Sequence, residues 1–78
     1  MKYIAFIHKE QDRYVGIVPD ISHTSSYGES PEETLAHLTE ACQLYVEGDD
    51  TLPVARPLSI LQEEEMIQDD ALSYVLEI

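Results

Sequence analysis

The sequence predicts a two-layer α+β domain, in which one long helix covers one face of a small mixed sheet. Residues 28–48 show the apolar period of an amphipathic helix. Three short segments rich in β-branched, aromatic or small polar residues precede this helix, and one follows it. The resulting order is βββαβ, with a short second helix before the last strand, and the long helix buries its apolar stripe on the sheet.

The long helix is predicted to begin after Ser30 and to end at Gly48. Ser30 fits the N-cap, Pro31 fits the first helical position, and Glu33 completes a capping box three residues after the cap. Gly48 fits a left-handed C-cap. A helix of this length is marginal alone in water, so its stability must come from burial of the apolar stripe. That stripe comprises Leu35, Leu38, Cys42, Tyr45 and Val46, with Thr39 alongside.

The strands before the helix are predicted at residues 2–8, 13–18 and 24–27. The first two are joined by a short polar turn at residues 9–12, so they pair as antiparallel neighbours. Gly16, inside the second strand, indicates a bulge or a close backbone approach. The third strand is short and polar, which is typical of an exposed sheet edge.

The closing strand is predicted at residues 71–78, where apolar and polar side chains alternate. The helical crossover reverses the chain, so this strand is expected to lie beside the first strand and parallel to it. In the connector, Pro53 and Pro57 exclude a regular helix, while Ser59 is expected to cap a short second helix with Gln62 three residues later. One sheet face stays uncovered in this arrangement, and apolar residues there favour self-association.

The length, the cysteine content and the net charge of the chain limit the class of protein to which it can belong. The 78 residues form one domain, residues 1–78, near the size where a single core just suffices. The single cysteine, Cys42, lies on the apolar stripe, which indicates a buried, reduced thiol and a cytoplasmic protein. No secretory signal or membrane-spanning segment is evident. Sixteen acidic and four basic residues give a net charge of −12, which disfavours binding to free nucleic acid. On charge alone, this acidity either attracts a basic partner or serves only to keep the protein soluble.

No constellation in the sequence predicts catalysis, a metal or a cofactor. The three histidines lack the spacing of a zinc site, and the acidic run at residues 63–70 lacks the pattern of a calcium loop. Asp20, Ser22 and His23 lie on one loop, whereas a catalytic triad is assembled from separated segments. The three glycines are too far apart to form a phosphate loop. These observations favour a non-enzymatic protein that binds another protein.

A known family shares this combination of motifs. The second strand ends in Pro19-Asp20-Ile21, Gly28 follows eight residues after Asp20, and the capped helix begins with SPEETL. Over essentially the whole chain, these motifs and the element order resemble the HicB family of antitoxins, specifically its N-terminal partial RNase H-like domain. The chain departs from the family at Ser22-His23-Thr24, where a Pro-Gly-Cys-like turn is usual.

The resemblance implies an antitoxin that masks a small, basic, RNA-cleaving toxin of the HicA type. Many family members add a C-terminal DNA-binding domain, but this chain stops at Ile78 after the closing strand, so direct DNA binding is not expected. The first strand contains no carboxylate, so a two-metal nuclease would lack ligands. A homodimer or higher homo-oligomer is expected. Charge and exposure predict partner contacts at Asp20, Glu29, Glu32, Glu33 and Glu40.

Two alternatives stay open at this point. One is an orphan oligomeric interaction module of the same fold, with no toxin partner, and a small basic reading frame beside its own would argue against it. The other, far weaker, is a small metal-dependent hydrolase that uses Asp20 and His23. Absence of bound metal in the purified protein would exclude the hydrolase.

Overall fold

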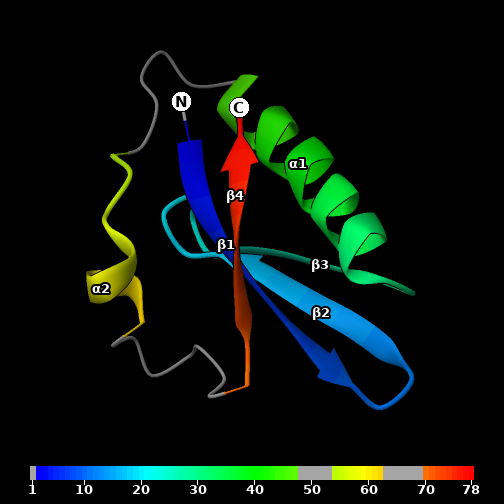
Figure 1. The fold of residues 1–78 in the computed structure, drawn as a ribbon. Coiled ribbons are helices and arrows are strands. Elements are labelled where there is room, and N and C mark those ends of the chain that lie inside the picture. The colour runs from blue at the N-terminus through cyan, green and yellow to red at the C-terminus, as the bar shows by residue number, and fades with distance from the viewer. Residues whose placement is uncertain (1, 48–53, 63–69) are drawn as a thin grey trace.

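The computed structural model describes residues 2–47, 54–62 and 70–78, which form one sheet and two helices (Figure 1). The sheet has four strands in the order β3-β2-β1-β4. Both the α+β class and the order of the elements along the chain match the sequence prediction. The elements are β1 (Lys2–Glu10), β2 (Arg13–Val18), β3 (Thr24–Gly28), α1 (Pro31–Glu47), α2 (Leu58–Leu61) and β4 (Leu72–Glu77).

The direction of β4 differs from the prediction. β4 pairs antiparallel with β1, from Lys2 opposite Glu77 to Ile7 opposite Leu72, so the predicted parallel last strand is wrong. In Figure 1, α1 ends near the N-terminus of β1, whereas β4 begins at the other end of the sheet. The chain therefore travels the length of the sheet once more between α1 and β4. This second reversal, absent from the predicted topology, makes every neighbouring pair antiparallel.

β1 has different partners along its length. Residues 2–7 pair with β4, and residues 6–10 pair with β2, so only Phe6 and Ile7 have a strand on both sides. β1 also extends two residues beyond its predicted end, because the hairpin register continues to Glu10 opposite Arg13. The turn thus shortens to Gln11 and Asp12, and Gln11 takes a left-handed conformation with φ 58°.

The start of α1 follows the predicted cap. The backbone N–H of Glu33 donates to Ser30 Oγ at 3.1 Å, and the backbone N–H of Thr34 donates to the Ser30 carbonyl at 2.9 Å. Gly28 is required just before this cap, because a Cβ there would lie 2.8 Å from the Thr34 nitrogen. The predicted C-cap at Gly48 lies outside the described residues.

The main core lies between α1 and the sheet. Leu38 and Cys42 are fully buried, as the helical period predicts, but Tyr45 remains 43% exposed in the last turn of α1. Gly16 allows α1 to approach β2, since a Cβ at Gly16 would lie only 2.6 Å from Leu38 Cδ1. This confirms the predicted close approach. The buried residues of this core are Tyr3, Ala5, Ile7, Val18, Ile21, Leu38, Cys42 and Leu76.

The second face of the sheet is partly covered, although the sequence predicts it bare. α2 lies on the side of the sheet away from α1 (Figure 1), and Leu61 of α2 is buried. Phe6 is also buried, although it alternates with the β1 residues that face α1. The expected Ser59 cap of this helix is wrong, because α2 begins one residue before Ser59 and the N-cap is Pro57. Its continuation past residue 62 falls outside the described residues.

Candidate partner-binding surface

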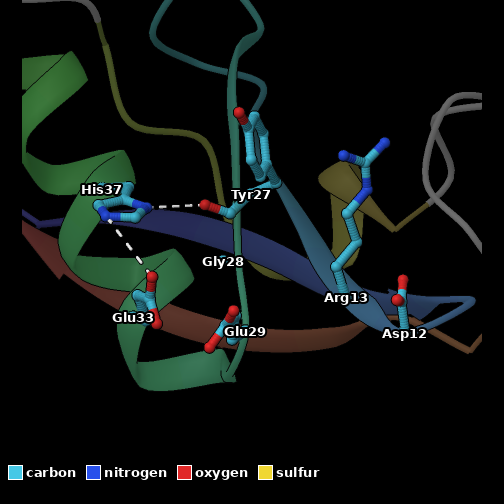
Figure 2. Close-up of a pocket in the computed structure, with 7 residues that line it drawn as sticks. All are labelled: Asp12, Arg13, Tyr27, Gly28, Glu29, Glu33 and His37. Carbon is cyan, nitrogen blue, oxygen red and sulfur yellow. Dashed lines mark hydrogen bonds and ion pairs between the residues drawn. The ribbon is translucent and has the colours of Figure 1, made fainter.

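A cleft of about 330 Å³ lies where the β1–β2 turn, the edge strand β3 and the first turns of α1 meet (Figure 2). The chain positions these three segments through the capped start of α1 and the close passage of Gly28 beside Thr34. Carboxylates outnumber cationic side chains in the lining, so the cleft has negative potential. The lining residues are Asp12, Arg13, Tyr27, Gly28, Glu29, Glu33 and His37.

His37 connects α1 to the edge strand. Its Nδ1 lies 2.7 Å from the carbonyl oxygen of Tyr27, and because a carbonyl only accepts, Nδ1 is the donor. Its Nε2 lies 4.0 Å from Glu33 Oε1, one helical turn earlier (Figure 2). Both side chains are exposed, so protonation of His37 adds only a weak ion pair. The main role of His37 here is to donate a hydrogen bond to a backbone carbonyl that points outward from the edge of the sheet.

Arg13 and Tyr27 form one wall of the cleft. The Arg13 guanidinium lies 5.0 Å from the centre of the Tyr27 ring, within the range of a cation–π interaction (Figure 2). This contact holds the cation against the ring. The carboxylates of Asp12, Glu29 and Glu33 remain on the other sides of the cleft.

Further carboxylates continue from the cleft along α1. Glu33, Glu40 and Glu47 recur near multiples of the helical period on its exposed side, and the helix sequence contains no Lys or Arg. Leu44 is 65% exposed beside them. Exposed apolar groups among polar ones are typical of protein interfaces. We refer to the following residues as the acidic helix face: Glu29, Glu32, Glu33, Glu40 and Glu47.

The predicted contact residues fall into two locations. Glu29 and Glu33 line the cleft, and Glu32 and Glu40 are exposed along α1, so these four share one surface. Asp20 lies apart from them. The sequence places it among the exposed carboxylates, but its side chain is only 3% exposed.

Asp20 instead connects two distant parts of the chain. Its Oδ2 accepts a hydrogen bond from the backbone N–H of Arg56 at 2.6 Å, and its Oδ1 accepts one from Arg56 Nε at 2.5 Å. The loop after β2 is shaped for this contact, since Ile21 is buried and Ser22 and His23 both have positive φ. Asp20 therefore anchors the connector that precedes α2 to the sheet.

Sequence reasoning misses several residues of the cleft. Tyr27 and Asp12 enter it only through tertiary structure, because one belongs to an edge strand and the other to a two-residue turn. A local signal does exist for His37. It follows Glu33 by four residues, the spacing that places two side chains on one helix face.

Two buried groups near Asp20 predict alkaline sensitivity. Burial raises the pKa of the Cys42 thiol from its ordinary value of 9.0, while a hydrogen bond with the Thr24 side chain acts in the opposite direction. Burial also raises the pKa of Tyr3 from 10.0, and the charges of Asp20 and Cys42 add to this shift. Both side chains therefore remain protonated in the folded protein at pH values where the unfolded chain begins to lose these protons.

Unfolding should accordingly become easier above about pH 9, because the unfolded chain then binds fewer protons than the folded one. Below that pH, both groups are neutral in both states and contribute a constant stability. Urea midpoints measured between about pH 7.5 and 10.5 check this expectation. The decline should be shallower in the Tyr3→Phe variant, and a midpoint that rises with pH would contradict the assignment.

Comparisons with known proteins agree with this fold. The family model described as HicB-like antitoxin of bacterial toxin–antitoxin system matches residues 3–78. The crystal structure of the Burkholderia pseudomallei antitoxin HicB is similar, with a TM-score of 0.80 and 21% sequence identity. That match covers 100% of this chain and 63% of the solved chain, so this chain spans under two thirds of that antitoxin.

A search of curated proteins gives no match. Within the described residues, no helix is long and apolar enough to cross a membrane. The family match, in contrast, extends over nearly the whole chain. The chain therefore belongs to the HicB-like antitoxins of bacterial toxin–antitoxin systems.

Proposed function

We propose that this antitoxin neutralises a small, basic, RNA-cleaving toxin of the HicA type by covering the toxin's RNA-binding surface with the acidic helix face. The observation that carries this proposal is the composition of α1. Its exposed side presents carboxylates without any Lys or Arg, and exposed Leu44 and Tyr45 lie near its C-terminal end. Such a surface offers both charge and apolar anchors to a partner.

The proposed mechanism is steric and electrostatic. A protein that cleaves RNA must attract phosphates, and Lys and Arg supply that attraction. Carboxylates on a folded helix compete for the same cations, and the net charge of −12 accelerates the encounter. Masking of this kind needs no catalytic group in the antitoxin. It also predicts that the complex weakens as salt rises.

The cleft supplies a concave part of this surface. Glu29 and Glu33 approach it from the start of α1, and Asp12 approaches it from the β1–β2 turn (Figure 2). A basic side chain of the toxin that enters the cleft meets carboxylates from two segments of the chain. Several carboxylates that meet one cation contribute more than a single exposed ion pair does.

Self-association is a second part of the proposal. A 78-residue domain buries a smaller share of its surface than larger domains do, so association with another copy adds stability. The antitoxin is proposed to act as a homodimer or higher homo-oligomer in the cytoplasm. Each copy then presents its own acidic helix face.

The partner is identified first. The tagged antitoxin is recovered from its native host at low and at high salt, and co-purifying proteins are identified by mass spectrometry. A stoichiometric small basic protein that is lost as salt rises is the expected result. Recovery of the antitoxin alone would favour an interaction module without a toxin.

Charge reversal on the acidic helix face then tests the contact. The double variant Glu29→Lys/Glu40→Lys should bind the recovered toxin about 100-fold more weakly at low salt, since each close charge pair contributes about 1.4 kcal/mol or more. The control Glu10→Lys/Asp70→Lys changes the net charge equally, at exposed positions outside this face. Calorimetric titration with both variants provides the measurement. Equal weakening by both variants would show a general charge effect and no localised contact.

A further inference from the structure

The outer edge of β3 has no neighbouring strand within the described part of the chain, since β3 is last in the sheet order and pairs with β2 alone. Along an antiparallel pair, the N–H and C=O groups of one residue point toward the neighbouring strand, and those of the next residue point away. The Tyr27 carbonyl accepts a hydrogen bond from His37 of α1, so Tyr27 points outward. By the same alternation, Ser25 points outward as well.

The register of the β1–β2 hairpin gives the same assignment independently. Its two-residue turn closes on Glu10 and Arg13, which in such a hairpin exchange both backbone hydrogen bonds. Alternation along β2 then directs the backbone groups of Gly16 toward β3, where its partner is Ser26. Ser26 therefore points inward, and the residues on either side of it present their N–H and C=O groups at the outer edge.

Hollows lie on both sides of this edge. The cleft described above extends across it, from Glu33 and His37 of α1 to Arg13 of β2 (Figure 2). A second hollow of about 390 Å³ lies on the sheet face opposite α1, because Val15 alternates with Gly16, over which α1 packs. The lining residues of this second hollow are Glu10, Arg13, Val15, Ser25, Ser26 and Tyr27.

An extended peptide fits an edge of this kind. Its backbone extends the sheet, and its side chains alternate between the two faces. On the β3 edge, one side chain lies beside Glu29 and Glu33, where a Lys or Arg fits, and the next lies in the second hollow. There Glu10 and Arg13 are opposite each other and compensate in charge, so an uncharged side chain fits.

The charges select the occupant. β3 itself, TSSYG, contains no Lys or Arg, so a second copy of this strand would bring no cation to the cleft and would add its own Glu29. A basic partner supplies the cation. We propose that an extended segment of the toxin joins β3 as a further strand, with alternating basic and uncharged side chains. This inference rests on the proposed function and assigns it a backbone contact.

His37 has a defined part in this step. In the unbound antitoxin its imidazole satisfies the outward Tyr27 carbonyl, which protects the edge from pairing with other chains. An N–H of the incoming strand replaces the imidazole, and the exposed His37 side chain turns to water. The contact that protects the edge therefore occupies the same carbonyl that the toxin uses.

Amide hydrogen exchange tests the added strand directly. It is followed by NMR in the full chain, alone and with the recovered toxin. The outward N–H groups of Ser25 and Tyr27 should exchange fast in the unbound chain and about 100-fold more slowly in the complex. The inward N–H of Ser26, which already bonds β2, is the internal control and should exchange slowly in both states.

A pair of substitutions at one position gives a second readout. Ser25→Pro removes an outward N–H without removing a hydrogen bond to β2, and Ser25→Ala removes the hydroxyl but retains that N–H. Calorimetric titration should show that Ser25→Pro binds the toxin about tenfold more weakly than Ser25→Ala does. Circular dichroism establishes that both variants are folded. If the proline variant is unfolded, the amide exchange of the wild type decides.

The outcomes separate strand addition from masking. A bound toxin that leaves the Ser25 and Tyr27 amides in fast exchange would refute strand addition, while masking by the acidic helix face would stand. Failure to recover any basic partner would refute masking and strand addition together. Slow exchange of these amides in the concentrated chain alone would assign the edge to a second copy and refute the toxin as its occupant.

Discussion

Leu38→Ala should lower the free energy of unfolding by about 3–4 kcal/mol, within the range of about 2–5 kcal/mol typical of buried leucines. Leu38 has no exposed surface and lies in the core between α1 and the sheet. For a domain of this size, such a loss is a large fraction of the total stability. Urea unfolding followed by circular dichroism gives the value, and Leu44→Ala, at a 65% exposed position of the same helix, should change it by less than about 0.5 kcal/mol.

A second substitution, Gly16→Ala, tests whether the Leu38 side chain fills the space next to Gly16. Gly16→Ala alone should be destabilising, because its Cβ would lie 2.6 Å from Leu38 Cδ1. In the Leu38→Ala background that atom is absent, so the new methyl occupies part of the cavity. The effects of the double variant should therefore fall short of the sum of the single ones. Strict additivity would mean that Leu38 and Gly16 do not share this space.

Asp20→Ala should cost about 2–3 kcal/mol, the second largest effect. The substitution removes two charge-assisted hydrogen bonds to Arg56, one of them to a backbone N–H that anchors the connector. The cost stays below that of breaking a fully buried pair, because the Arg56 side chain is 40% exposed and its charge can turn to water. Asp12→Ala, an exposed carboxylate in a turn, is the matched control for stability.

Toxin affinity of the same variant distinguishes anchoring from direct contact. At a temperature where Asp20→Ala is fully folded, its affinity for the toxin should equal that of the wild type, because the carboxylate is turned inward. A tenfold loss of affinity in the folded variant would instead assign Asp20 to the interface. Asp20→Asn should be intermediate in stability, since it keeps the shape and loses the charge.

Local signals in the sequence predict α1 well. The Ser30 cap, Pro31 at the first helical position and the burial of Leu38 and Cys42 all depend on residues within a few positions of one another. The direction of β4 depends instead on how far the chain travels after Glu47. Neither hydrophobic period nor residue propensity gives that distance, so the sequence predicts one reversal of the chain where two occur.

On the candidate binding surface, too, local sequence signals could place some residues, whereas contacts between distant residues could not be predicted. Glu29 and Glu33 could be assigned to one surface because the helical cap and period place them there. The burial of Asp20 could not, since its partner Arg56 is 36 residues away. Tyr45 illustrates the remaining difficulty. The helical period gives the direction of its side chain, but not how much of the fold lies beneath it.

The pairing of β1 has a consequence for how the antitoxin is made. Residues 2–7 are translated long before their partner strand, Leu72–Glu77, which lies far downstream in the sequence. Until those residues leave the ribosome, the first half of β1 lacks this neighbouring strand, and contacts between such distant segments form slowly. A nascent chain therefore does not have the complete sheet that supports α1. The proposed masking of a toxin by the acidic helix face therefore requires that β4 has been synthesised and has joined β1.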